Sequence, residues 1–484
     1  MFLNFSNPIK YSNKAVYSPN DKYFAITKSL DLIIYDTLTL KQVQKFSFSD
    51  YIEHIEWSKD SSLILIGLFK RGIIEIKQLF KPEWLCHLNE GIAGITHAYF
   101  APDSRSVLTI CNNNLKLSIW SLVNKTITYI PMPKYAKKGV SFTSNGHFMA
   151  LAINTTPNDS VGVFYVGNWT QLHKFTTKCE DLQDMQWSYD NSTLLITDTK
   201  LVCRLYIYTP TGDLVNVIEP YEYKLGIRNV KLSPNGRFIG VGCYDQSVKM
   251  YYNVSYTLIN EFYHNDVNAC FANKKVNYFK EESVDSYYGG KTRYVSVEPP
   301  VDFIKSTSPM TNDVNPKMGV NKMEYSYDSC FLATRNDNTM NVVFIWELMG
   351  MNLHTVIIQL KDVTDFKWCP NRHVLFILTG TSKLFYFTLD SIFVMELPTN
   401  FTANTIQLNS DGRKFILNDP DYMIVGNCVN ANGGGCYEVK GSEEKEEEDD
   451  EEGVMEGEND DDDGDNNVEN VYNKHKVVFK EGKP

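Results

Sequence analysis

The stretch HIEWSKDSSLILIGLFKRGIIEIKQLFKPEWLCHLNE, residues 54–90, carries the pattern that decides the fold. Apolar and polar residues alternate in HIEWSKD, which ends in a Ser/Asp turn, and SSLILIGL follows as a continuous apolar run. The tripeptide KRG is typical of a hairpin turn before a third strand, IIEIKQL, and a fourth, EWLCHLNE. A continuous apolar run between alternating ones predicts a middle strand that is buried on both faces. The stretch therefore predicts four short strands in succession.

The strand-and-turn element of this stretch recurs along the chain. An aromatic or aliphatic residue closes an alternating strand before a turn rich in Ser, Pro, Asn, Asp and Gly at positions 17, 57, 100, 142, 187, 232, 325, 368 and 408. Seven of the eight intervals between these positions lie between 40 and 45 residues, and one is 93 residues long. An aromatic also closes the third strand of many units, as Trp120, Tyr208 and Trp346 do. A four-stranded repeat of about 42 residues predicts an all-β WD-repeat β-propeller.

The repeat count predicts about nine four-stranded blades across residues 1–440, most simply in one ring. Two incomplete rings, or eight blades with an appendage, stay open because nine exceeds the usual range of blade numbers. We expect Phe2 to Phe5 to pair with the last blade and close the ring. The long interval contains an irregular insertion, residues 265–319, which is either a loop whose strands extend a blade or a degenerate tenth blade.

The charge of the chain is divided very unevenly. Of the net −12, residues 441–470 contribute −16, whereas residues 1–440 hold 42 basic and 41 acidic residues. A nearly neutral body lacks the basic face that nucleic-acid binding usually needs, so we expect no nucleic-acid partner. Residues 441–472 have almost nothing to bury and are expected to form a disordered acidic tail. Residues 473–484 form a short basic terminus whose apolar VVF could add to a sheet edge.

The sequence contains none of the common motifs for nucleophilic catalysis, nucleotide binding or zinc binding. The nucleophile elbow G-x-S-x-G, the phosphate loop G-x-x-x-x-G-K-[ST] and the zinc motif H-E-x-x-H are all absent. The ten cysteines include no C-x-x-C pair and are expected to be reduced thiols, mostly in apolar strands. No apolar run is long enough to span a bilayer, and the N-terminus does not resemble a signal peptide. We therefore expect a cytoplasmic protein that is not an enzyme and has no catalytic residue, metal or cofactor.

Particular strings in the chain resemble a known family more closely than generic blades do. They are HIEWS (54–58), FKRG (69–72), PEW (82–84), EGIAGI (90–95), YEYKLGI (221–227), VGCYDQSVK (241–249), NPKMGV (315–320) and FLATRNDN (331–338). The chain resembles the centrosomal WD-repeat proteins called WD-repeat protein eight, or the WRAP class, from about residue 11 to about residue 430. The acidic tail departs from that resemblance.

The resemblance implies a scaffold at the microtubule-organising centre, that is, the centrosome or spindle pole. Family members act there with a coiled-coil anchoring protein of the SSX-interacting type, help anchor microtubule minus ends and support spindle assembly. In fungi the pair recruits a minus-end-directed kinesin. The resemblance therefore implies a cytoskeletal location and, as partners, the anchoring protein, such a kinesin and other centrosomal proteins.

Two polar segments are candidates for partner binding. Arg335, Asn336, Asp337 and Asn338 occupy an expected turn between two apolar strands, where they either satisfy backbone groups or contact a partner. The segment Tyr221 to Tyr223, with Glu222 between the two aromatics, lies at a blade boundary. Tyrosine is enriched at interfaces, but packing between blades explains this segment equally well.

Two further functions fit a propeller. Lys70 and Arg71 in FKRG resemble the Phe-Arg-Arg-Gly motif of phosphoinositide-binding propellers, in which two cations hold a phosphorylated headgroup. The second position is Lys in this chain, and a plain hairpin turn explains the segment as well. A translation-initiation propeller that contacts the ribosome or initiator tRNA would fit the number of repeats, but the neutral body argues against it.

Overall fold

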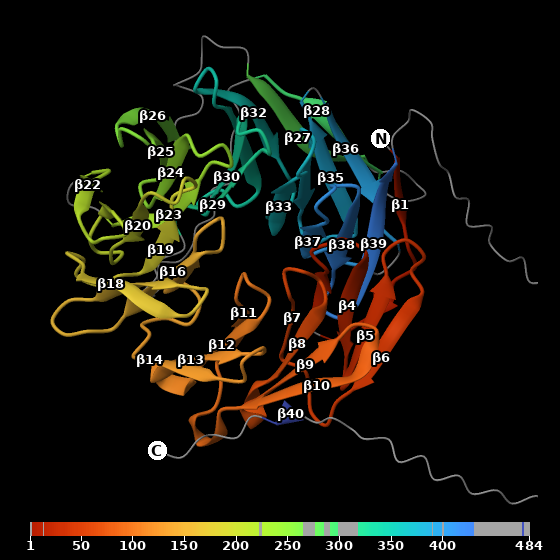
Figure 1. The fold of residues 1–484 in the computed structure, drawn as a ribbon. Helices are drawn as coiled ribbons and strands as arrows, with labels where there is room; N and C mark the ends of the chain where they lie inside the picture. The colour runs from red at the N-terminus through yellow and green to blue at the C-terminus, as the bar shows by residue number, and fades with distance from the viewer. Residues whose placement is uncertain are drawn as a thin grey trace, which may run out of the picture.

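Nine sheets of short strands stand around a common axis and form one ring in the computed structural model (Figure 1). The structure describes residues 2–12, 14–221, 225–264, 276–284, 291–298, 318–389, 391–398, 401–429 and 477–478. Each sheet is a blade whose strands a, b, c and d follow one another from the ring axis outward. The prediction of one nine-bladed ring is confirmed over these residues.

In each of the first three blades, four antiparallel strands follow one another in chain order. Blade one holds β3 (Ala15–Tyr17), β4 (Tyr23–Lys28), β5 (Asp31–Asp36) and β6 (Gln42–Ser47). Blade two holds β7 (His54–Trp57), β8 (Leu63–Leu68), β9 (Ile73–Gln78) and β10 (Lys81–Asn89). Blade three holds β11 (His97–Phe100), β12 (Ser106–Ile110), β13 (Lys116–Ser121) and β14 (Ile127–Pro131). Three single 3-10 turns lie at η1 (Phe69–Arg71), η2 (Gly91–Ala93) and η3 (Asn112–Asn114).

The next three blades repeat this order. Blade four holds β15 (Val140–Phe142), β16 (Phe148–Ile153), β17 (Ser160–Tyr165) and β18 (Thr170–Thr176). Blade five holds β19 (Asp184–Trp187), β20 (Leu194–Thr197), β21 (Leu205–Tyr208) and β22 (Leu214–Ile218). Blade six holds β23 (Ile227–Leu232), β24 (Phe238–Cys243), β25 (Ser247–Tyr252) and β26 (Leu258–Tyr263).

Among the last three blades, blade seven carries additional outer strands and blade nine takes its fourth strand from the N-terminus. Blade seven holds β29 (Val320–Tyr325), β30 (Phe331–Asn336), β31 (Val342–Glu347) and β32 (Asn352–Ile358). Blade eight holds β33 (Asp365–Trp368), β34 (Leu375–Leu378), β35 (Lys383–Thr388) and β36 (Ser391–Glu396). Blade nine holds β37 (Thr405–Leu408), β38 (Lys414–Asn418) and β39 (Tyr422–Val429), and its fourth strand comes from the N-terminus.

The hydrophobic core is divided among the interfaces between blades. The described residues form nine clusters of buried side chains, and each joins two consecutive blades, including blade nine with blade one. The middle strands supply most of these side chains, since every residue of β8 and of β12 is buried. A blade on its own would expose both faces, so the ring is the arrangement that buries them.

The recurring turn between strands a and b is held by a serine. In five blades the Ser Oγ donates to an Asn or Asp two residues later and accepts the backbone N–H five residues later; these are Ser18, Ser58, Ser188, Ser233 and Ser326. The residue after that Asn or Asp has a positive φ, for example 58° at Asp21 and 61° at Ser61. Side-chain hydrogen bonds of this kind are why Ser, Asn and Asp favour turns.

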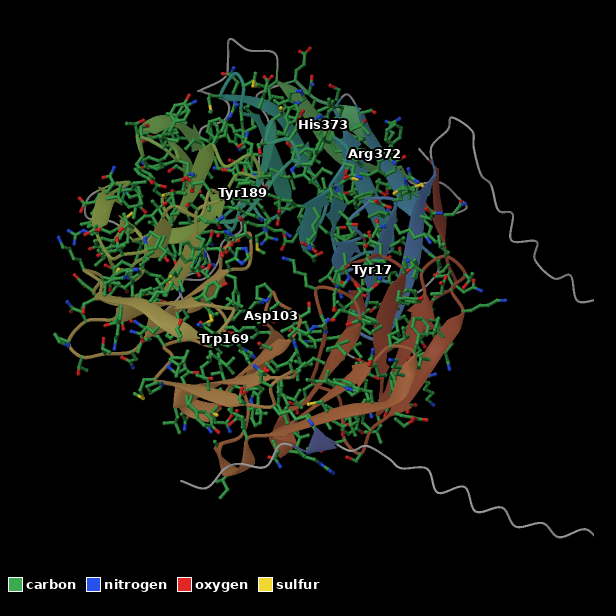
Figure 2. All side chains as sticks on the ribbon, viewed as in Figure 1. Tyr17, Asp103, Trp169, Tyr189, Arg372 and His373 are labelled. Carbon is green, nitrogen blue, oxygen red and sulfur yellow. The ribbon has the colours of Figure 1, made fainter. Side chains whose placement is uncertain are left out.

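The a–b turns also link neighbouring blades. The Asn20 backbone N–H donates to Ser61 Oγ at 3.0 Å, and the Asp60 backbone N–H donates to Ser104 Oγ at 3.2 Å. The tryptophan at the end of strand a in blade two also links two blades, since Trp57 Nε1 donates to the Val16 carbonyl of blade one at 3.2 Å. Figure 2 shows labelled residues from these turns or their edges, such as Tyr17 and Tyr189, around the ring axis. The repeated turn motif thus sets both the hairpin and its contact with the next blade.

The N-terminal strand closes the ring. Strand β1 (Phe2–Phe5) pairs antiparallel with β39, with Leu3 opposite Cys428, and so becomes strand d of blade nine. Leu3 is buried between blades eight and nine, and the Phe5 ring lies edge-on to Phe415 with centroids 6.1 Å apart. The short β2 (Ile9–Lys10) continues along β39 before the chain enters blade one. The predicted pairing of the N-terminus with the last blade is confirmed.

The insertion extends blade seven outward. Strand β27 (Asn277–Val284) pairs parallel with β32, and β28 (Lys291–Ser296) pairs antiparallel with β27, which makes a six-stranded sheet. Of the two readings of residues 265–319, the described strands support the blade extension rather than a tenth blade. Residues 265–275, 285–290 and 299–317 of that segment lie outside the described residues, as does the whole predicted acidic tail, residues 441–472. Near the other end, β40 (Val477–Val478) pairs parallel with Cys86 and His87 of β10, so this part of VVF adds to a sheet edge as predicted.

Candidate protein-interaction face

The two faces of the ring carry different connections. Because adjacent strands of a blade run antiparallel, a–b and c–d turns lie on one face, which we call the turn face. The b–c turns and the connections from strand d to the next strand a lie on the other, the loop face. Several strings that carry the family resemblance lie in or lead into the loop face, among them residues 69–72, 90–95 and 331–338. Propellers usually recognise partners through loops on the rigid ring, so the loop face is the first candidate for partner binding.

The segment Arg335 to Asn338 lies on the loop face but is largely buried. Arg335, Asn336 and Asp337 are each less than 9% exposed, and Asn338 is half-buried. Asn338 Oδ1 accepts the Gly319 backbone N–H at 3.1 Å, and Asn336 Oδ1 accepts the Asn338 backbone N–H at 3.2 Å. The turn is therefore held by its own polar side chains.

Charged groups of the same segment join three blades. Asp337 receives Arg228 Nη2 of blade six at 3.2 Å and Arg335 Nη2 at 3.5 Å. Arg335 Nη1 donates in turn to the Val363 carbonyl, just before blade eight. The side chains of all three charged residues are at most 12% exposed, and a buried charge in this setting needs its partner.

This burial favours the structural interpretation of Arg335, Asn336 and Asp337, whereas partner binding by these residues stays a prediction. Inside the ring, their side chains form hydrogen bonds and ion pairs with other groups of the fold. The sequence could not distinguish the two because Arg228 lies 109 residues from Asp337 along the chain. Binding through the half-buried Asn338 stays a prediction.

Tyr221 is the part of the second candidate segment that the structure describes, and it packs against the core between blades five and six. Its hydroxyl donates to the backbone carbonyls of Leu225 and Gly226, the latter at 3.3 Å. The ring lies beside the core cluster between blades five and six, with Lys249 Nζ 5.6 Å from its centroid. Burial raises the pKa of the Tyr221 hydroxyl well above its usual range. Glu222 and Tyr223 lie outside the described residues, so partner binding by this segment stays a prediction.

Lys70 and Arg71 occupy the 3-10 turn between β8 and β9, which ends at Gly72 with a φ of 64°. Arg71 Nε lies 3.0 Å from Asp50 Oδ2, and Lys70 Nζ lies 4.0 Å from Glu53 Oε1. Both carboxylates belong to the connection that precedes blade two. A phosphorylated headgroup would have to displace them, so the geometry favours the hairpin interpretation over a lipid site.

A buried polar network in blade seven was not singled out from the sequence. His264 Nε2 and Trp346 Nε1 both lie within hydrogen-bond reach of Thr334 Oγ1, at 2.8 and 2.9 Å, and His264 Nδ1 lies 2.8 Å from the Gln246 carbonyl. Burial lowers the pKa of His264 to about 4, so the imidazole is neutral near neutral pH. In the sequence, only Trp346 at the end of the third strand pointed to this network. Its partner Thr334 comes from strand b, and His264 follows the preceding blade.

Blade three contains a charged version of this network. Glu90, in the connection before the blade, accepts hydrogen bonds from Thr109 Oγ1 and from Trp120 Nε1, and it pairs with Lys116 at 3.0 Å. Burial opposes the charge of Glu90, but the hydrogen bonds and the Lys116 ammonium outweigh it and lower the pKa of its carboxyl. Both networks tie the d–a connection to the next blade, and both are structural.

Metal sites and thiols are the two kinds of reactive group that matter for chemistry in the described residues. They contain no group of three or more His, Cys, Asp or Glu placed to hold a metal ion. Burial raises the pKa of the thiols of Cys86, Cys179 and Cys428 to about 12, so these thiols stay protonated and unreactive. No helix in the described part of the chain is long and apolar enough to cross a membrane. What this part of the molecule offers is a rigid ring with two loop-bearing surfaces.

Comparisons with known proteins agree with this architecture. Residues 213–251 match the family described as WD domain, G-beta repeat. The chain is 32% identical over 415 residues to WD repeat-containing protein WRAP73 of Mus musculus, which covers 82% of this chain and 89% of that protein. It is 21% identical over 264 residues to an uncharacterized WD repeat-containing protein of Schizosaccharomyces pombe, covering 53% of this chain and 52% of that one.

A solved structure shares the ring at low sequence identity. It is described as the crystal structure of the eukaryotic initiation factor and superimposes with a TM-score of 0.54 and 13% identity, covering 81% of this chain and 90% of that one. At this identity the likeness shows the fold alone.

Proposed function

Since the chain belongs to the WD-repeat family of WRAP73, we propose that it is a protein-interaction scaffold of the microtubule-organising centre. In that role it helps anchor microtubule minus ends and supports spindle assembly together with a coiled-coil anchoring partner of the SSX-interacting type. The observation that carries the proposal is the 32% identity that extends over most of both chains. A minus-end-directed kinesin and other centrosomal proteins are further proposed partners.

The fold supports a scaffold in a physical sense. The nine inter-blade clusters and the polar links between turns make the ring a stiff body. A stiff body with loops on two faces can hold two partners at once without losing conformational entropy of its own on binding. The WD domain match indicates no enzymatic family.

The proposal is tested by following the tagged full chain in dividing cells of its source. We expect the fluorescence to coincide with a marker of the spindle pole and the anchoring partner to coprecipitate. Depletion of that partner should disperse the signal, and depletion of this chain should detach microtubule minus ends. Absence from the pole at every stage of the cell cycle, or unchanged polar signal after complete loss of the partner, would contradict the proposal.

Exposed aliphatic side chains allow a matched comparison of the two faces. Ile92 and Leu201 are exposed on the loop face, whereas Leu38 and Val254 are exposed in c–d turns on the turn face. We expect Ile92→Asp with Leu201→Asp to weaken coprecipitation of the anchoring partner, and Leu38→Asp with Val254→Asp to leave it unchanged. Equal melting temperatures of the two double variants serve as the folding control.

The translation-initiation alternative is separated by sedimentation in low salt. A propeller that works on the ribosome would travel with the small ribosomal subunit, whereas a centrosomal scaffold would not. A lipid site at Lys70 and Arg71 would require that replacing both by Ala abolishes binding to phosphoinositide vesicles.

A further inference from the structure

Basic residues from four different blades gather near the ring axis on the loop face. Lys14 precedes β3 of blade one, His97 begins β11 of blade three, Lys137 and Lys138 precede β15 of blade four, and Lys200 lies in the b–c connection of blade five. Lys14 Nζ also lies 2.8 Å from Nδ1 of His54, the first residue of strand a in blade two. We call Lys14, Lys137, Lys138 and Lys200 the cationic cluster; His97 lies beside it.

Electrostatic effects within the cluster show that its members are close together. Burial and then the charge of Lys137 lower the pKa of Lys14. Burial and then His54 lower the pKa of His97, with smaller contributions from Lys137 and Lys14. Burial, Arg228 and Lys138 lower the pKa of Lys200. Lys137 and Lys138 therefore reach from blade four toward blades one, three and five.

The segment that carries Lys137 and Lys138 is firmly anchored. Lys134, whose side chain is 9% exposed, forms ion pairs with Asp159 and Asp181. At the other end of the segment a Cβ on Gly139 would lie 2.9 Å from the Tyr135 carbonyl oxygen, so the backbone folds closely onto itself there. An anchored segment presents its two exposed lysines at a fixed place, which reduces the entropy lost when an anion binds.

Lys14, Lys137 and Lys138 have little compensating negative charge among the described residues. Glu56 acts on Lys14, and Asp184 lies near Lys138, but burial raises the pKa of the Asp184 carboxyl. In the described part of the chain, neither Lys14, Lys137 nor Lys138 forms an ion pair with a carboxylate. Like charges held together in this way are relieved by an anionic ligand.

Apolar side chains are exposed on the same face. Leu201 follows Lys200 directly and is 78% exposed, and Ile92, in the connection before blade three, is fully exposed. Cations together with exposed aliphatic groups fit a peptide that alternates carboxylates with apolar residues. They fit a nucleic acid less well, because residues 1–440 carry almost no net charge and would not attract a long polyanion.

We propose that the cationic cluster, with Leu201 beside it, is the binding site for an extended acidic segment of a partner protein. The carboxylates of the segment take the positions between Lys14, Lys137, Lys138 and Lys200, and apolar residues of the segment contact Leu201. The site lies near the ring axis, so one segment reaches several blades. The proposal goes beyond the centrosomal function and does not depend on it.

The test measures binding of a fluorescein-labelled peptide of alternating Glu and Leu to the full chain by fluorescence anisotropy. We expect saturable binding that weakens as the salt concentration rises. Lys137→Glu with Lys138→Glu should weaken binding at least about tenfold, a typical effect of reversing exposed charges at a charged interface. Leu201→Asp should weaken it further.

The matched control is Lys22→Glu with Lys41→Glu. Both residues are exposed in turns of blade one on the turn face, and the control changes the net charge by the same amount. Every variant keeps residues 441–470, so the same acidic stretch is present in all of them. No binding to the wild-type chain, or equal loss in the control, would overturn the proposal. Equal affinity for single-stranded DNA of the same charge would overturn its assignment to a peptide.

Discussion

Closure of the ring by β1 allows a sharp test of how the fold is held. Leu3 is 6% exposed and packs in the cluster between blades eight and nine. Leu3→Ala removes buried methyl groups and leaves a cavity, a change that costs about 2–4 kcal/mol at such sites. Since β1 is a terminal strand paired on one side only, we expect this cost to fall on local opening of the strand rather than on the whole ring.

The expected size of the effect follows from that cost. About 3 kcal/mol corresponds to a change of roughly a hundredfold in the equilibrium constant for opening. The backbone N–H of Val425 donates to Ser6 Oγ on the β1 side, and N–H groups alternate in direction along a strand, so the amides of β39 that face β1 include Val425 and Asn427. These two amides should then exchange with deuterium roughly a hundredfold faster. Hydrogen exchange read by mass spectrometry on peptides that cover β39 measures this directly. A chain of nine blades need not unfold in one step, so a single denaturation midpoint would be less informative.

Asn4→Ala is the matched control for this experiment. Asn4 is exposed on the same strand, and its backbone pairing with Asn427 does not need its side chain. We expect exchange in β39 to change little in this variant. If the amides of Val425 and Asn427 exchanged equally slowly in Leu3→Ala and in Asn4→Ala, the N-terminal strand would not be the element that closes the ring, and the reasoning would fail.

Three further changes test other parts of the structure. Asp337→Ala leaves Arg228 and Arg335 buried without their shared carboxylate and should destabilise the chain by about 3–5 kcal/mol, which a lowered urea midpoint would show. The pKa of His264 is about 4 in the folded chain against 6.5 for the free side chain, so the unfolded chain binds the extra proton between these values. Stability should therefore fall as the pH drops from 6.5 toward 4, by at most about 1.4 kcal/mol per pH unit, and His264→Gln should flatten this slope of the melting temperature. Ser58→Ala removes the hydrogen bonds that close the a–b turn of blade two and should cost about 1–2 kcal/mol; an unchanged thermal midpoint would argue that the turn does not need them.

Much of the fold followed from local chemistry that recurs along the chain. The serine of each a–b turn bonds within five residues, so a motif such as Trp57-Ser58-Lys59-Asp60 already specifies its hairpin. The burial of every residue in β8 was also foreseeable, because a continuous apolar run can only lie between two covered faces. The pairing of Phe2 to Phe5 with the last blade could be anticipated because a ring needs one strand to close it.

The candidate site was harder to predict because its members come from distant parts of the chain. Arg335 and Asp337 looked like an exposed polar turn, and only the position of Arg228 on the neighbouring blade shows that they are buried partners. The network around His264 was missed for the same reason, since its histidine and Thr334 lie 70 residues apart. Polar residues in a turn look alike in a sequence whether they face solvent or the next blade.

By itself, the sequence determined that the chain folds into repeated four-stranded units, because turn chemistry and apolar alternation act over a few residues. It also determined the unequal distribution of charge along the chain. The tertiary structure alone decided which side chains of different units meet, as Arg228 and Asp337 do on the loop face. That outcome depends on the angle and number of blades around the axis, which are set by the packing of whole sheets and leave no local pattern in the sequence.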